Sequence, residues 1–87
     1  MNEPTLKELR KKIDAIDDSI LELLRKRISV AKEIGKAKKN SLIYDPEREK
    51  MVIQRLLLLA PDIESEALSN IYTSIITLCR SVQMRSK

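Results

Sequence analysis

Apolar residues recur along the first half of the chain with heptad spacing. One row falls seven or fourteen residues apart and the second is offset by three: Leu6, Ile13, Ile20 and Ile34, then Leu9, Ile16, Leu23, Val30 and Ala37. Such a repeat is typical of a helix that packs against another helix along a continuous seam. Thr5 and Glu8 fit a capping box at its start, and no proline follows before Lys39. The pattern predicts one helix from about residue 5 to residue 39.

Two shorter helices are expected after a connector at residues 40–44. Asp45 and Pro46 are typical of a helix start, with Asp as N-cap and Pro in the first turn. This second helix is expected over residues 46–59, because Ala60-Pro61-Asp62 breaks the helical pattern directly after it. A third helix is expected over about 64–84, because apolar residues again follow helical spacing. The predicted fold is therefore all-α, with a long, a short and a medium helix in one domain over residues 1–87.

The first helix is too long for a compact monomer. Thirty-five residues at about 1.5 Å each give a helix of roughly 50 Å. A compact globule of this chain length has a radius of gyration of about 12 Å, and hence a diameter near 30 Å. The apolar seam must therefore find a partner, and we expect an intertwined homodimer.

The composition removes several classes of function. The 87 residues include no His, Trp or Phe, one Gly and one Cys, and the net charge is +4. The chain therefore has no imidazole base, no disulfide framework, no zinc site built from Cys alone, and no glycine-rich phosphate loop. We expect neither a metal nor a cofactor. A nucleic-acid-binding role is disfavoured because aromatic stacking residues are scarce and the basic residues are dispersed among acids.

No targeting or membrane segment is evident. The first residues lack the charged region and apolar run of a signal peptide, and the longest apolar run is far too short to span a bilayer. We expect a cytoplasmic protein with a reduced thiol, without membrane association.

Two cations interrupt the apolar pattern of the long helix. Arg27 occupies a seam position, and Lys38 follows eleven residues later. At 100° per residue the two side chains lie within about 20° of each other around the helix and about 16 Å apart along it. A buried cation is costly unless it faces an anion, so the pair suggests an anion site. Taken alone, however, the spacing favours side chains that snorkel to the surface or pair with nearby acids.

Other candidate residues have equally simple structural explanations. Arg10 lies about 25 Å from Arg27 along the helix, so it could join the same site only from an antiparallel partner helix; by default it is a surface residue. Glu49 could turn inward as an acceptor or merely favour the helix start. Cys79 and Gln83 share a helix face, where Cys79 could be a small core residue and Gln83 a solvated one.

Taken together, these residues resemble the all-α chorismate mutases over about residues 5–83. The resemblance rests on four segments: Leu9-Arg10-Lys11-Lys12-Ile13-Asp14-x-Ile16-Asp17, Leu23-Leu24-x-x-Arg27, Ile34-Gly35-Lys36-Ala37-Lys38 and Asp45-Pro46-x-Arg48-Glu49. It implies three helices per chain, two interlaced chains with shared active sites, and rearrangement of chorismate to prephenate. The chain would be free-standing or the first domain of a longer aromatic-pathway enzyme, without feedback control in this domain.

The resemblance also implies roles for individual residues. Arg27 of one chain and Arg10 of the other would grip the two carboxylates of the substrate. Lys38 and Gln83 would contact its ether oxygen, and Lys38 also a carboxylate. Glu49 and the Arg48 backbone would bind the ring hydroxyl, and Asp45 would lie beside them. Cys79, in place of the usual Ser, would face a carboxylate. A thiol is the weaker donor.

Two rival functions remain open. An isochorismate–pyruvate lyase shares the fold and the cationic pocket, although Glu49 and Gln83 together favour the mutase. A non-catalytic helical dimerisation module would give no reason for Arg27 in the seam.

Overall fold

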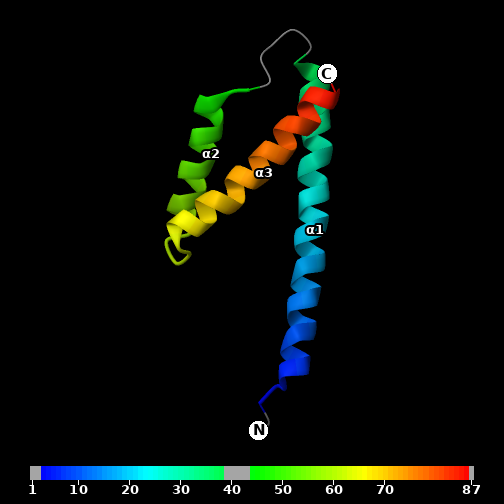
Figure 1. Ribbon diagram of the computed structural model, residues 1–87, viewed down its shortest axis with the longest axis vertical. Coiled ribbons are helices and arrows are strands. Elements are labelled where there is room, and N and C mark those ends of the chain that lie inside the picture. Colours follow the sequence, from blue (N-terminus) through cyan, green and yellow to red (C-terminus); the bar gives the residue numbers. More distant parts are fainter. Residues whose placement is uncertain (1–2, 39–43, 87) are drawn as a thin grey trace.

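The computed structural model describes residues 3–38 and 44–86, which form three helices and no strand (Figure 1). Helix α1 spans Leu6–Ala37, α2 spans Pro46–Leu59 and α3 spans Ser65–Ser86. The prediction of an all-α fold is confirmed. Residues 39–43, which include the expected end of the first helix and most of the connector, lie outside the described residues.

Local capping explains where the first two helices begin. The Thr5 hydroxyl accepts from the Glu8 amide at 3.1 Å, and the Glu8 carboxylate accepts from the Thr5 amide at 3.4 Å. These reciprocal bonds satisfy amides that have no partner within the helix. At α2 the Asp45 side chain accepts from the Arg48 amide at 3.1 Å, and Pro46 occupies the first turn. Both helix starts are thus determined by residues within four positions.

The core lies where α3 crosses the C-terminal part of α1. Ala31, Cys79 and Val82 form a buried cluster, against which Ile28 and Ile75 pack. Figure 1 shows α3 running diagonally from α2 to the C-terminal end of α1. Among the described residues, α3 contacts both other helices, whereas α1 and α2 do not contact each other. Helix α3 therefore determines how the other two are placed.

Gly35 allows the close approach of α1 and α3. A Cβ atom at this position would lie 2.5 Å from the carbonyl oxygen of Gln83 and 2.9 Å from its Cα. Both are backbone atoms and cannot rotate away. The absence of a side chain at Gly35 thus brings the end of α3 directly against α1.

The N-terminal part of α1 projects from the rest of the molecule. Every residue from 3 to 23 is exposed, including the apolar heptad positions, with Leu6 62% and Leu23 64% exposed. The radius of gyration is 16.8 Å, against about 12 Å expected for a compact chain of this length. An apolar stripe of this length left in water is characteristic of a surface that binds another protein.

In the described ranges, each helix falls short of the length or the apolar character that a bilayer crossing requires.

Candidate functional site

A cavity of about 500 Å³ opens between the three helices. Helix α1 and its C-cap contribute Arg27, Val30, Ala31, Ile34 and Lys38; α2 and its N-cap contribute Asp45, Arg48, Glu49 and Val52; α3 contributes Ile76, Cys79, Arg80 and Gln83. Seven of the eight residues that sequence reasoning selected therefore line one cavity. Arg10 is the exception.

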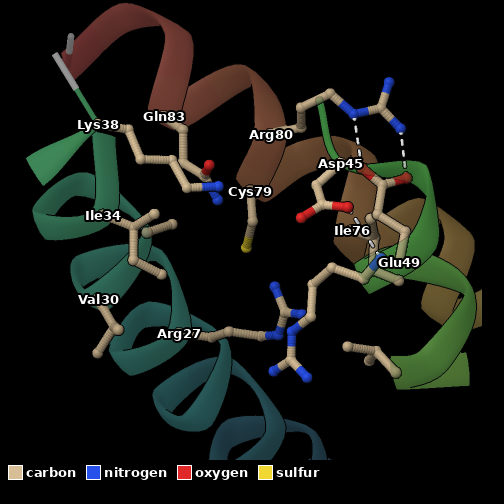
Figure 2. Close-up of a pocket in the computed structure, with 13 residues that line it drawn as sticks. Arg27, Val30, Ile34, Lys38, Asp45, Glu49, Ile76, Cys79, Arg80 and Gln83 are labelled. Atoms are coloured by element: carbon tan, nitrogen blue, oxygen red, sulfur yellow. Dashed lines mark hydrogen bonds and ion pairs between the residues drawn. The ribbon is translucent and has the colours of Figure 1, made fainter. Parts of the chain in front are cut away.

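Lys38 and Gln83 point into the same part of the cavity (Figure 2). Lys38 is the C-cap of α1, and its amide donates to the Ile34 carbonyl at 2.9 Å. Gln83 lies in the last turns of α3, directly across from Gly35. The crossing at Gly35 therefore places an ammonium and a neutral amide, both hydrogen-bond donors, beside the same space.

Arg27 and Cys79 point into the cavity from opposite helices (Figure 2). Arg27 is half-buried on α1, one turn before the core residue Ala31. Cys79 is a free cysteine, and only 2% of its surface is exposed. The cation that interrupts the heptad seam thus faces a cavity lined by both polar and apolar side chains.

The start of α2 brings two more predicted residues to the rim. Asp45 and Arg48 line the cavity, and both are exposed. The Arg48 amide donates to the Asp45 carboxylate at 3.1 Å. The resemblance assigned this amide to the substrate hydroxyl, whereas in the structure its hydrogen already has a partner within the cap. Asp45 therefore acts structurally at this rim.

Glu49 is bound by a residue that the sequence reasoning missed. Arg80 donates from Nε to Glu49 Oε2 at 3.0 Å and from Nη2 to Glu49 Oε1 at 2.7 Å. Its guanidinium also lies 4.3 Å from the ring centre of Tyr44. The hydrogen bond to Glu49 raises the pKa of Arg80 further above its ordinary, already very high value. A signal for Arg80 existed, because Ile76, Cys79, Arg80 and Gln83 follow the i, i+3, i+4, i+7 spacing of one helix face.

Arg10 lies far from the cavity of its own chain. It is exposed on the projecting part of α1, seventeen residues and about 25 Å from Arg27 along the helix. Its expected contribution to a site in a partner chain stays a prediction.

The cavity carries an excess of positive charge. Arg27, Lys38, Arg48 and Arg80 stand against Asp45 and Glu49, which leaves a formal charge of +2. Glu49 and Arg80 neutralise each other in a salt bridge. The formal charge of the cavity therefore suits a small molecule with two negative charges. In the same described ranges no three Cys, Asp or Glu side chains are grouped so that they could hold a metal ion.

Comparison with known protein families gives one matching model. A model described as chorismate mutase type II matches residues 9–84, which is most of the chain. The match includes all eight predicted site residues. No solved structure was found to match the chain.

Several curated proteins are similar in sequence. A bifunctional chorismate mutase/prephenate dehydratase of Aquifex aeolicus is 44% identical over 94% of this chain and 25% of its own length. A chorismate mutase of Methanocaldococcus jannaschii is 50% identical over 59% of this chain and 54% of its own length. A 3-dehydroquinate dehydratase of Pyrobaculum aerophilum is 32% identical over 91% of this chain and 24% of its own length. The chain thus spans between a quarter and about half of the length of these relatives.

Proposed function

Because the chain belongs to the chorismate mutase type II family, we propose that it catalyses the rearrangement of chorismate to prephenate. The observation that supports this most strongly is the cavity that gathers Arg27, Lys38, Glu49 and Gln83. The substrate carries two carboxylates, and the formal charge of the cavity is +2. The names of the relatives support the same activity.

The chemistry of this rearrangement suits the residues of the cavity. It is a unimolecular pericyclic shift, which needs no nucleophile, no metal and no proton transfer. It needs the substrate held in a compact, chair-like conformer. Arg27, together with Arg10 of a partner chain, would hold the two carboxylates by forked hydrogen bonds and thereby supply that orientation.

Lys38 and Gln83 would lower the barrier electrostatically. As the carbon–oxygen bond breaks, negative charge grows on the ether oxygen. Two donors aimed at that oxygen stabilise the transition state more than the ground state. Glu49 would accept a hydrogen bond from the ring hydroxyl and fix the ring in the cavity. In this scheme the enzyme requires no cofactor.

The proposal includes a homodimer with shared sites. The exposed apolar stripe of α1 supports a second copy as its partner, because an antiparallel α1 would bring Arg10 toward the other chain's cavity. Fusion to a second domain is supported by the bifunctional relatives. We assign the enzyme to the cytoplasm, where the thiol of Cys79 stays reduced.

The test is turnover of chorismate by the purified chain. Prephenate is identified by its acid conversion to phenylpyruvate, and isochorismate is assayed in parallel for salicylate and pyruvate. We expect prephenate from the wild type and at least a hundredfold lower kcat/KM in Lys38→Ala, about the loss of one transition-state donor. Lys36→Ala, an exposed neighbour outside the cavity, is the matched control.

Each outcome separates the candidates. Salicylate and pyruvate in place of prephenate would reassign the chain to the lyase. A folded dimer that turns over neither compound would favour the dimerisation module. Equal losses in Lys36→Ala and Lys38→Ala would remove Lys38 from the reaction.

A further inference from the structure

Arg80 connects three segments at the edge of the cavity. It projects from α3, donates two hydrogen bonds to Glu49 of α2, and stacks on Tyr44, which directly precedes the N-cap of α2. Its side chain is 30% exposed, and that of Glu49 is 22% exposed. The pair joins residues 31 positions apart, so it is a tertiary contact and not a pairing within one helix.

The geometry of the pair leaves Glu49 able to bind a further donor. A carboxylate has about four acceptor positions, of which a forked guanidinium uses two. Figure 2 shows the guanidinium of Arg80 on the side of Glu49 away from Arg27. The acceptor positions on the cavity side therefore stay free.

The pair also determines the charge that the cavity presents. The guanidinium of Arg80 lies 2.7 Å from Glu49 Oε1 and neutralises the charge of this carboxylate. Without Arg80, an uncompensated carboxylate would line a cavity that has to accept a doubly negative molecule. It would repel that molecule, and its side chain would be free to leave the orientation that accepts a hydroxyl.

We propose that Arg80 is a positioning residue: it fixes and neutralises the Glu49 carboxylate so that this group accepts a hydrogen bond from the hydroxyl of a dicarboxylate substrate. This inference rests on the proposed function. Arg80 acts through Glu49, whose bond to the ring hydroxyl exists in both the ground state and the transition state. Its loss therefore weakens substrate binding without slowing the chemical step.

The first test compares Arg80→Met with Arg85→Met in the full chain, using chorismate as the probe. Methionine retains an apolar stem, and Arg85 is exposed on the same helix outside the cavity. We expect Arg80→Met to raise KM about tenfold or more, the usual effect of losing a hydrogen bond to a charged group, with kcat changed less than about threefold. Arg85→Met should match the wild type in both constants.

The second test distinguishes this positioning role from a salt bridge that only holds α2 and α3 together. We expect the double variant Arg80→Met with Glu49→Gln to have a KM at least about threefold lower than that of Arg80→Met alone. The reason is that removing the unpaired carboxylate removes its repulsion of the substrate. If the salt bridge only held the helices together, KM would not recover, because the double variant also lacks the salt bridge. Arg80→Lys, which retains the charge but not the fork, should give an intermediate KM.

The outcomes that overturn the inference are distinct from failure of the function. If the wild type makes no prephenate, the proposed function falls and this inference with it. If the wild type is active and Arg80→Met keeps its KM, or loses kcat instead, or is not improved by Glu49→Gln, the positioning role alone falls. Circular dichroism of each variant checks that the helices are retained.

Discussion

Among the single residues of the cavity, Cys79 offers a direct test of substrate contact. Its side chain is buried and reaches the cavity from α3. A serine hydroxyl is a stronger donor than a thiol. We expect Cys79→Ser to lower KM for chorismate about two- to tenfold, the effect of one neutral hydrogen bond. Cys79→Ala should leave KM near the wild-type value, and equal KM values for the serine and alanine variants would show that position 79 does not face a carboxylate.

Gln83 determines the expected pH dependence. The chain has no His, the residue type whose ordinary pKa lies between about pH 5 and 8. Because the Gln83 amide is neutral at every pH, kcat/KM of the wild type should be flat across that range. A carboxyl donates a hydrogen bond only when protonated. Gln83→Glu should therefore lose activity as pH rises, and a flat profile for this variant would contradict the role of Gln83 as a donor.

At the scale of the helices, Gly35 controls how α1 and α3 meet. Alanine has the higher helix propensity, by about 1 kcal/mol. Its Cβ would, however, lie 2.5 Å from the Gln83 carbonyl oxygen, so the backbone of α3 would have to move. Overpacking typically costs about 1–3 kcal/mol, so after that gain we expect Gly35→Ala to destabilise the protein by up to about 2 kcal/mol net.

The same displacement should reduce catalysis, because Gln83 moves away from Lys38. Thermal unfolding and kcat are both measured, with Lys36→Ala as a control that adds alanine without approaching α3. An unchanged melting temperature and kcat in Gly35→Ala would mean that the crossing tolerates a methyl group.

The helices follow from local signals, whereas their contacts do not. Thr5 with Glu8, and Asp45 with Pro46, mark helix starts in the sequence because both capping interactions lie within four residues. The close approach at Gly35 and the pairing of Glu49 with Arg80 depend on residues far apart in the chain. Helical spacing can place Arg80 on the cavity face, but it does not show which acid it meets.

At the scale of the whole molecule, the exposed stripe of α1 predicts a dimer with shared sites. We expect Arg10→Ala and Lys38→Ala to be nearly inactive separately. When the two variants exchange subunits at equal amounts, half of the dimers are mixed, and each mixed dimer has one site with both cations. Activity should therefore return to about one quarter of the wild-type value. Absence of recovery, with exchange verified by mass spectrometry, would contradict sharing between chains.

The separation of Arg10 and Lys38 along α1 has a consequence for inheritance. In the proposed dimer each site takes Arg10 from one chain and Lys38 from the other. A chain that lacks both cations would therefore inactivate both sites of any dimer that it joins. Such an allele would act as a dominant negative: expressed in excess, it would sequester normal chains in inactive pairs. Under the proposed function, cells that rely on this chain for prephenate would then lack it while still making the normal protein.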